Sequence, residues 1–576
     1  MKKIFLAAMA AVALFASCEK EPALSLSDNT ETLEYKASTF DVEVVTGGNW
    51  NLAAAEDYTW VTASKTSGMA GDVITFTTQL NVTGKIRTAK FNVLSGDQTQ
   101  EISINQKSGV LDAVLSLSLV NVAQGAAIFD LGIQTSNADD YKEYGVYYAT
   151  EADITKAQRK VLGSDVAEGT KNVTLDGLTA DVEYYAWPFI VALTGEEVVA
   201  ETALKVVPPI CVDDPAKVQE TIDAAAEYSV IRLLGGMVVT GGIEMKSNIT
   251  VSGGWSQDFS AQNAAKTVIE GDLNVAACFV PEGTVGAVIQ NLELTKGNIQ
   301  SVDGRATGGG VRFAGDITIE NCYIHHNRAF SRGGGIGTVG DGAPATVVVI
   351  NSEISHNIAE DSHGAGINIG EGAKLIMVNS LVADNWNQEP GGYAGAVVVY
   401  GSCVLVNNTI ANNYQFDSWH TFDIRSGNNG SYLVNNIVVG SKFTNASKCG
   451  HGSVEGWTWE QFETIKDKFE ADPSPNIVAH GASEGNERVI VNNLVEVSVQ
   501  GVGDGNTVVE KGYDQSLLFA DWANYDYRLF ASSVAVNAGV TTDPVAAEYL
   551  TKYALDLAGN ARVAGEKVDL GCYELQ

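Results

Sequence analysis

One short unit recurs six times between residues 288 and 440. The six copies read VIQNLELTKGN (288–298), TIENCYIHHN (318–327), VINSEISHN (349–357), MVNSLVADN (377–385), LVNNTIANN (405–413) and LVNNIVVG (433–440). Their lead asparagines are spaced by 30, 30, 28, 28 and 28 residues. A period of this length, built on alternating Val and Ile rather than on a helical pattern, is typical of one coil of a β-solenoid. The sequence therefore predicts an all-β fold in which successive coils stack as parallel strands.

Asparagines that recur at one place in every unit are expected to form a ladder through the stacked coils. Coils of parallel strands lie about 4.8 Å apart, so equivalent residues stand above one another. Asparagine tolerates a left-handed turn, and its amide can pass hydrogen bonds up the stack. The predicted ladder consists of Asn321, Asn351, Asn379 and Asn407, with Asn291 and Asn435 at its ends.

A second motif keeps step with the asparagines. Three tiny residues precede one branched apolar residue at 308–311, 333–336, 364–367 and 394–397. Such a sequence fits a tight corner that leads into a strand.

The two motifs together resemble those of right-handed parallel β-helices of the pectin-lyase-like superfamily, and their rhythm is similar to the repeats of polymorphic outer-membrane proteins. The closing stretches DYRLFASSVAVNAG (526–539) and DLAGNARVAGEKVDLGCYE (556–574) are similar to the end module of many bacterial surface β-helix proteins. The resemblance covers residues 209–576 and implies a right-handed parallel β-helix there. It implies no single activity, because the superfamily includes lyases, hydrolases, adhesins and passive scaffolds.

The start of this region predicts a helical cap. Asp214 and Pro215 fit an N-cap and a first helical residue. Val218, Ile222 and Ala225 then follow at i, i+4 and i+7. A short amphipathic helix with this pattern would cover the open edge of the first coil, which otherwise invites pairing with other chains.

The N-terminus has the pattern of an export signal. A basic start, KK (2–3), precedes an apolar run (4–16) that is too short to span a bilayer. The closing ASC (16–18) resembles a bacterial lipobox, which implies that residues 1–17 are a lipoprotein signal peptide and that Cys18 carries the lipid. Plain secretion is the alternative. We expect an outer-membrane lipoprotein of the cell envelope, exposed at the surface and held to the membrane only by its anchor.

After a linker at 18–27, two small β-domains are predicted at 28–108 and 109–208, because apolar residues alternate in both. The first carries, in order, Trp50, Trp60–Val61, Ser67–Gly68, Asn81, Arg87 and Ile104–Asn105–Gln106. That order resembles the BACON domain, a β-sandwich, and the resemblance implies contact with glycans or mucin. Trp50 and Trp60 could stack on sugars, although tryptophans in strands more often pack in the core.

The second domain carries a different sequence motif. LDGL (175–178), followed by Tyr184 and Tyr185, resembles the end of a fibronectin type III-like β-sandwich. No site is recognised in it, and we expect it to hold the β-helix away from the membrane.

The net charge and the motifs limit which partners and cofactors are expected. A formal net charge of -34 in 576 residues leaves no basic face for nucleic acid. No cofactor is expected, and although calcium is left open, no D-x-D-x-D-G loop is present. No metal site is predicted, because the spacing of the cysteines fits neither zinc nor a compact disulfide framework. Cys322 and Cys403 fall on coil strands, where a small buried thiol is the simpler role.

Two sets of residues in the repeats are candidates for a site. His326, His356, Asp384 and Asn412 share one ladder position, and the two imidazoles and the carboxylate could bind a metal or shuttle protons, although polar residues also favour turns. Trp386 and Tyr414 lie one above another near Trp419, and if exposed they would offer faces for sugars, with corner packing as the alternative.

The sequence favours binding over catalysis. We expect non-catalytic binding or adhesion to glycans or host surface polymers. A polysaccharide lyase or glycoside hydrolase with a non-standard site is the alternative, and a purely structural surface protein is the third. GHG (450–452) matches a tripeptide of polygalacturonase-like hydrolases, but no paired aspartates precede it in the repeats. The insertion at 441–515 has no readable role, although Trp457 and Trp459 are candidates for the edge of a binding surface.

Overall fold

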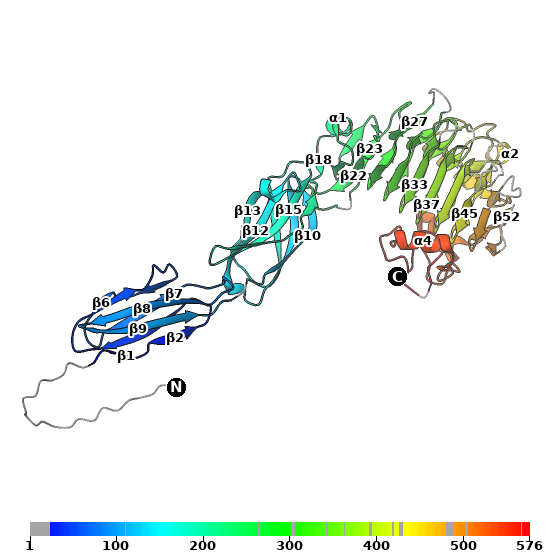
Figure 1. Ribbon diagram of the computed structural model, residues 1–576. Coiled ribbons are helices and arrows are strands. Elements are labelled where there is room, and N and C mark those ends of the chain that lie inside the picture. The colour runs from blue at the N-terminus through cyan, green and yellow to red at the C-terminus, as the bar shows by residue number, and fades with distance from the viewer. Residues whose placement is uncertain are drawn as a thin grey trace, which may run out of the picture. The chain divides into compact units, whose positions relative to one another are not determined.

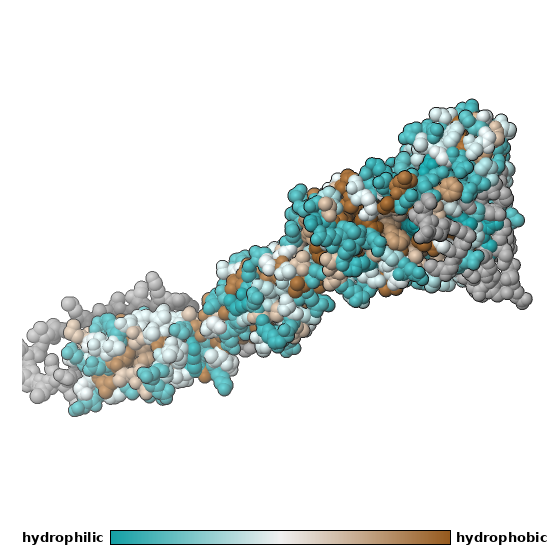
Figure 2. All heavy atoms as spheres, turned by 90° about the horizontal axis from the view of Figure 1, so that it is seen from above, coloured by the Kyte–Doolittle hydropathy of each residue, from teal (hydrophilic) through white to brown (hydrophobic). Residues whose placement is uncertain are grey.

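The computed structural model describes residues 23–576, apart from 110, 263–264, 301–305, 341–343, 362, 391–393, 418–419, 426–429, 480–487, 501–504 and 566. Cys18 and Trp419 lie outside the described residues. The described chain is built mainly from β-strands (Figure 1). It divides into two compact units. One unit comprises the chain up to Val120, Ala127–Leu175 and Glu183–Val206, and the other comprises Asn121–Ala126, Asp176–Val182 and Val207–Gln576. The face shown in Figure 2 is largely hydrophilic, with hydrophobic residues gathered in patches.

Two sheets form the N-terminal part of the first unit. One has the order β1 (Ser25–Leu26), β3 (Ser38–Val45), β7 (Val73–Thr78) and β5 (Val61–Ala63). The other has the order β2 (Thr30–Leu33), β9 (Gln98–Gln106), β8 (Arg87–Ser95), β4 (Trp50–Ala54) and β6 (Ser67–Gly68). Trp50, Phe76 and Phe91 belong to one buried cluster contributed by both sheets. This part therefore has a shared apolar core, as the alternating sequence predicts.

Two more sheets follow in the same unit. The smaller consists of β10 (Val114–Ala123), β11 (Ala126–Gln134) and β14 (Gly169–Asp176). The larger contains β13 (Gln158–Gly163), β12 (Tyr141–Ala149), β15 (Tyr184–Ala192), β16 (Glu197–Val199) and β17 (Leu204–Val206). Short 3-10 turns, η1 (Ala138–Asp140) and η2 (Ile154–Lys156), flank β12.

The second unit is built from four long sheets. Sheet 1 runs β18 (Ile210–Val212), β19 (Val230–Leu234), β22 (Thr250–Trp255), β25 (Ala287–Gln290), β29 (Ile317–Glu320), β33 (Thr346–Ile350), β37 (Lys374–Val378), β41 (Ser402–Val406), β45 (Ser431–Val434), β50 (Arg488–Val491). Sheet 2 runs β20 (Val238–Thr240), β23 (Thr267–Glu270), β26 (Leu292–Thr295), β30 (Tyr323–His325), β34 (Glu353–Ser355), β38 (Leu381–Ala383), β42 (Thr409–Ala411), β46 (Ile437–Val439), β51 (Leu494–Glu496), β53 (Thr507–Val509).

The other two sheets complete each coil. Sheet 3 runs β21 (Ile243–Glu244), β24 (Cys278–Val280), β28 (Val311–Phe313), β32 (Ile336–Thr338), β36 (Ile367–Ile369), β40 (Val397–Val399), β44 (Phe422–Ile424), β49 (Ile477–Ala479), β52 (Val499–Gln500). Sheet 4 runs β27 (Asn298–Ile299), β31 (Arg328–Ala329), β35 (Ile358–Ala359), β39 (Trp386–Asn387), β43 (Tyr414–Phe416), β47 (Lys442–Thr444), β48 (Glu470–Ala471).

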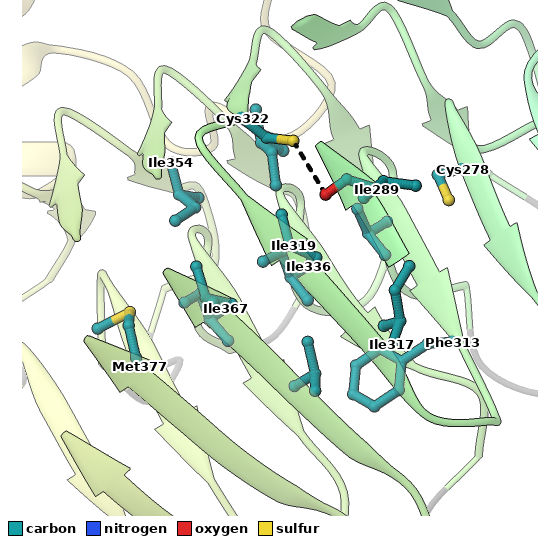
Figure 3. Close-up of a cluster of buried hydrophobic side chains, with 14 of the residues drawn as sticks. Cys278, Ile289, Phe313, Ile317, Ile319, Cys322, Ile336, Ile354, Ile367 and Met377 are labelled. Atoms are coloured by element: carbon teal, nitrogen blue, oxygen red, sulfur yellow. Dashed lines mark hydrogen bonds between the residues drawn. The ribbon is translucent and has the colours of Figure 1, made fainter. Parts of the chain in front are cut away.

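Each repeat of the sequence contributes one strand to each of sheets 1, 2 and 3, and equivalent residues pair in register. Ile289 pairs with Ile319, and Ile319 pairs with Val349, all in parallel. The inward residues of the sheets meet in one core, to which Ile319, Ile336 and Ile354 belong (Figure 3). Long parallel sheets of this kind are consistent with a β-helix.

The cysteines of the described part are free thiols. Cys322 and Cys403 are both buried in the core. The Cys322 thiol contacts the backbone oxygen of Ile289 at 3.8 Å (Figure 3). Burial raises the pKa of Cys322 to about 11, so the thiol is protonated at neutral pH.

The lead asparagines turn the corner between sheets 1 and 2 with a left-handed backbone. The φ values are 50° at Asn321, 45° at Asn351, 50° at Asn379 and 56° at Asn407. The amides of these four residues do not form one continuous stack, because Oδ1 of Asn351 and Oδ1 of Asn379 have no hydrogen-bond partner among the described residues. Asn321 donates to Asn291 (2.9 Å), whereas Asn379 and Asn407 donate to backbone oxygens of the C-terminal segment. Backbone oxygens of the C-terminal segment therefore accept the amide hydrogen bonds that an asparagine of the neighbouring coil would accept in a continuous stack.

The unbroken amide stack lies at the next corner, between sheets 2 and 4. Nδ2 of Asn327 donates to Oδ1 of Asn357 (3.1 Å). Nδ2 of Asn357 in turn donates to Oδ1 of Asn385 (3.0 Å), and Nδ2 of Asn385 donates to Oδ1 of Asn413 (3.0 Å). These four residues are buried. Glycines shape the corner before sheet 3, where a Cβ on Gly334 would lie 2.3 Å from the Ile358 carbonyl oxygen.

Helices cover both the first coil and the outer face of later coils. At the start, η3 (Pro215–Lys217) leads into α1 (Val218–Ala224), whose Val218 and Ile222 join the coil core. Near the end, α4 (Pro544–Lys552) packs Ala546 and Leu550 against valines on the outer face of sheet 1. The outer face of sheet 2 is covered in its later coils by η5 (Gln515–Leu517), β54 (Phe519–Asp521), η6 (Trp522–Asn524) and β55 (Asp526–Leu529). No helix in the described residues has both the length and the apolar character that a membrane crossing requires.

Candidate functional site

Polar side chains gather on the outer face of sheet 2 where the C-terminal cover stops. Three neighbouring strands, β26, β30 and β34, align Glu293 with Tyr323 and Glu353, and align Thr295 with His325 and Ser355. The intervening Leu294, Ile324 and Ile354 are buried in the core. Because side chains alternate along a strand, burying these three apolar residues places the polar set on the outside.

Two of these groups, Glu293 and His325, form a hydrogen-bonded chain with His326, which directly follows β30. Oε1 of Glu293 lies 2.9 Å from Nε2 of His325, and Nδ1 of His325 lies 2.7 Å from Nδ1 of His326. Burial, together with a smaller effect of His326, lowers the pKa of His325 to about 3, so His325 is neutral at pH 7. One arrangement of protons satisfies both contacts: His325 donates from Nε2 to Glu293 and accepts at Nδ1 from His326. The chain ends at His326, which is exposed.

The structure brings two of the three candidate catalytic residues together. The rings of His326 and His356 stack with their centroids 5.2 Å apart and their planes 2° from parallel. Burial, with a smaller contribution from His326, lowers the pKa of His356 to about 3, and burial also lowers the pKa of His326. Asp384 follows in the ladder and shares its left-handed backbone, but it is buried and accepts a hydrogen bond from Tyr527 (2.6 Å). Within the described residues, no group of three or more His, Cys, Asp or Glu side chains could hold a metal ion.

The inserted segment between strands β47 and β48 places an aromatic ring over the two histidines. It contains α2 (Ala446–Cys449), α3 (Trp459–Glu463) and η4 (Lys466–Lys468). The Trp459 ring centroid is 5.3 Å from that of His356 and 6.2 Å from that of His326, and its Nε1 donates to the His356 backbone oxygen. A capping box between Thr458 and Gln461 fixes the start of α3.

Tyr525, from the C-terminal cover, completes the cluster. Its ring meets that of His356 edge to face at 4.9 Å, and its hydroxyl accepts from Lys466 at 2.9 Å. We call His326, His356, Trp459 and Tyr525 the corner patch. His326 and Tyr525 are exposed, while His356 and Trp459 are half-buried. With neutral imidazoles beside indole and phenol rings, the patch offers apolar ring faces together with hydrogen-bonding edges, a combination that suits sugars.

The expected sugar-stacking stripe on Trp386 and Tyr414 is wrong in its premise, because neither ring is exposed. Trp386 is 0% exposed and Tyr414 is 2% exposed. Phe462 of α3 lies 4.7 Å from the Trp386 ring and 4.9 Å from the Tyr414 ring. The insertion therefore packs against these two rings and buries them, and its Trp459 lies on the outer side of this cluster. Trp419 falls outside the described residues.

Several residues of the site carry no repeat signal and were missed in the sequence. Glu293 and Tyr323 lie on ordinary coil strands, and Tyr525 lies far along the chain. Lys266 was missed as well: its Nζ donates to Oδ1 of Asn291 (3.0 Å), and burial lowers its pKa although Glu293 and Glu353 act in the opposite direction. In-register alignment of 28- and 30-residue repeats could have brought Glu293 to Tyr323, but no sequence pattern places Tyr525.

The tryptophans of the N-terminal sheets differ in exposure. Trp50 is 0% exposed, and its Nε1 donates to the Met69 backbone oxygen (2.9 Å). Trp60 is half-buried and carries the Arg87 guanidinium 4.3 Å from its ring centroid. Trp50 is therefore a core residue, and Trp60 already has a cation on one face.

Residues 49–107 match a family model described as "BACON: Putative binding domain, N-terminal". The matched segment spans strands β4 to β9 and includes Trp50, Trp60 and Arg87. This finding supports the predicted N-terminal BACON domain. No curated protein matches the chain.

Likeness to solved structures is weak. A Bacteroides ovatus GH5 xyloglucanase in complex with a XXXG heptasaccharide is 22% identical over 16% of this chain and 20% of its own, with a TM-score of 0.15. Titin domains A168–A170 are 8% identical over 31% of this chain and 60% of theirs (TM-score 0.19), and chicken CNTN1 FN1–FN3 domains are 10% identical over 33% and 66% (TM-score 0.18). The chain thus spans about a fifth of the xyloglucanase and under two thirds of the titin fragment. TM-scores this low support no statement about function.

Proposed function

We propose that this protein is a lipid-anchored, surface-exposed envelope protein that binds glycans or host surface polymers without catalysis. The observation that carries the proposal is the match of residues 49–107 to the family model described as "Putative binding domain, N-terminal". In this proposal Cys18 bears the lipid, the two sheet pairs of the first unit form a BACON-like and a fibronectin type III-like sandwich, and the coils form a right-handed β-helix.

The corner patch supports the same function on the second unit. Binding residues are often aromatic rings held rigidly at a surface, because little conformational entropy is lost when they engage a ligand. Trp459 is held by its hydrogen bond to the His356 backbone and by ring contacts with His326 and His356. The proposed role for the patch is to stack on the apolar face of a sugar while the exposed His326 bonds its hydroxyls.

Retention on polysaccharides tests the proposal. Residues 19–576 would be run through native gels containing neutral or acidic polysaccharides, and we expect at least one polymer to slow the protein. Trp459→Ala should weaken that retention about tenfold, the loss expected for one stacked ring. Trp459→Phe, which keeps a flat ring, should restore most of it. Failure of every polysaccharide to retain the parent protein would contradict the proposal.

A second candidate, cleavage of a polysaccharide, is favoured by one observation. The chain from Glu293 through His325 to the exposed His326 is arranged so that it can carry a proton to or from a bound ligand. The same polysaccharides would be followed for ultraviolet-absorbing unsaturated ends and for new reducing ends. We expect neither to form; their appearance, and their loss in His326→Ala, would favour the enzyme.

A further inference from the structure

The first coils of the second unit are narrower than those that follow. Two residues separate β20 from β21 and seven separate β23 from β24, whereas fifteen separate β26 from β28. Sheet 4 accordingly begins only at β27, in the third coil. The tight first corner depends on Gly242, whose φ is 71° and where a Cβ would lie 2.3 Å from the Ala276 carbonyl oxygen. The coils therefore widen in a step.

A hollow of about 920 Å³ occupies that step. Helix α1 forms one wall, because Gln219 accepts from the backbone N–H of Glu244 (2.8 Å) and donates to the Glu244 backbone oxygen (3.1 Å). The corner at Thr240 and the strand β27 residue Ile299 bound the other sides. The side of the molecule on which α1 and β27 lie faces the viewer in Figure 2, and hydrophobic residues gather there among hydrophilic ones. We call this hollow the step groove.

Three residues of different chemistry stand in register along the groove. Glu244 on β21 pairs with Phe279 on β24, and Phe279 pairs with Arg312 on β28. One coil separates each from the next, about 4.8 Å. Glu244 is exposed, and Phe279 and Arg312 are half-buried. A carboxylate, a ring face and a guanidinium are thus presented in a row on a rigid sheet.

This row fits a carbohydrate better than other ligands. The C–H face of a sugar packs on an aromatic ring, and planar carboxylate and guanidinium groups bond neighbouring hydroxyls in pairs. A purely apolar ligand would leave Glu244 and Arg312 without water, which is costly. Asp223 on α1 adds a second carboxylate to the wall, and the chain has a formal net charge of -34, so an anionic chain would be repelled.

We propose that the step groove is a binding site for a neutral oligosaccharide. The groove is formed by other residues than the corner patch and by another part of the chain than the BACON segment, so it adds a site to the proposed function. It shares only the ligand class with that function. Phe279 stacks on the sugar ring, and Glu244 and Arg312 bond its hydroxyls on either side.

Filling the groove tests the site without disturbing the core. Thr240 is exposed and lines the groove, so Thr240→Trp should block it. Val238, two residues earlier on the same strand β20, is 43% exposed and does not line it, so Val238→Trp is the matched control. Glu244→Gln keeps the shape of the side chain and removes its charge.

Residues 19–576 would be titrated calorimetrically with neutral gluco-, xylo- and manno-oligosaccharides. We expect at least one to bind, with a loss of tenfold or more in Thr240→Trp, a smaller loss in Glu244→Gln, and no loss in Val238→Trp. Hydrogen exchange with that oligosaccharide should show protection at 240–244 and 274–280. Equal affinity of Thr240→Trp and the parent, or protection elsewhere only, would overturn the proposal.

Other outcomes separate this inference from the proposed function. A protein that polysaccharide gels retain through Trp459, but that binds none of the oligosaccharides, overturns the step groove alone. A protein that binds neither polymer nor oligosaccharide overturns both. A tenfold loss in Val238→Trp equal to that in Thr240→Trp would show that the change acts through the fold, and it would overturn the assignment to the groove.

Discussion

The hydroxyl of Tyr527 donates a hydrogen bond of 2.6 Å to Oδ2 of Asp384, which lies 143 residues earlier in the chain. Behind it, Asn412 donates from Nδ2 to the Tyr527 hydroxyl (3.1 Å), and Gln515 donates from Nε2 to Oδ1 of Asn412 (2.8 Å). Every donor in this chain points toward the Asp384 carboxyl. This chain of hydrogen bonds therefore fixes the C-terminal cover to Asp384 and Asn412, which follow strands β38 and β42 of sheet 2.

Asp384→Asn is expected to stabilise the protein at alkaline pH. Burial raises the pKa of Asp384 from its usual 3.8 to about 7, so the folded state holds the proton more tightly than the unfolded state. Stability should then fall as pH rises from about 4 to about 7 and stay low above that range. The rise in pKa corresponds to a cost on the order of 4 kcal/mol at pH 8. Asparagine can still accept from Tyr527 without ionising.

Thermal melting of residues 19–576 between pH 4 and pH 9 checks this prediction. The Tm of Asp384→Asn should exceed that of the parent by most at pH 8 and by least near pH 4. Asp57→Asn, a change at an exposed carboxylate, serves as the control and should follow the parent at every pH. A Tm difference that does not change with pH would contradict the expected role of Asp384.

Asn357→Ala should destabilise the second unit more than Asn351→Ala. The Asn357 amide donates to Ile324, Ser355 and Asn385, and its Oδ1 accepts from Asn327. Each buried group left without a partner costs about 1–3 kcal/mol. Oδ1 of Asn351 is buried without a partner among the described residues, so its loss should cost less.

Urea unfolding of the two variants measures the difference directly. Asn29→Ala, at an exposed position outside the repeats, should leave the free energy of unfolding nearly unchanged. If Asn351→Ala proves as costly as Asn357→Ala, the amide stack at 327, 357, 385 and 413 is not the stronger of the two ladders.

Trp386→Ala should lower stability rather than act directly on a ligand. The ring is fully buried against Phe462, and removing a buried aromatic ring costs about 3–5 kcal/mol. Trp457 is half-buried, so Trp457→Ala is the matched change and should cost less. Differential scanning calorimetry would compare the two. A Trp386→Ala protein that melts like the parent but loses glycan binding would return Trp386 to the list of binding residues.

Cys18→Ala should release the protein from the membrane. A thioether-linked lipid requires the thiol of Cys18, so the variant should appear in the soluble fraction or accumulate with its signal peptide uncleaved. Fractionation of cells, with Cys211→Ala as the control, would show which. Membrane partition and processing identical to the parent would contradict the lipoprotein proposal.

The repeat alone predicts the coils. Each unit of 28 to 30 residues carries the same alternation of apolar and polar residues, and this alternation determines which side chains are buried. Val347, Leu375 and Cys403 stack in register in the core, as their spacing predicts. The position of the helical cap follows from the same kind of signal at Val218 and Ile222.

Which rings reach the surface depends on contacts between distant segments, and the sequence could not decide it. The repeat places Trp386 and Tyr414 at one corner, but whether that corner is exposed depends on Phe462 from the insertion. Likewise, the identical ladder positions of His356 and Asp384 acquire different surroundings, because Trp459 covers one and Tyr527 bonds the other. A periodic sequence determines which side chains face inward, since each coil sees the same neighbours above and below. The outer face is determined by segments that do not repeat, so only the tertiary structure assigns its residues to cover or to solvent.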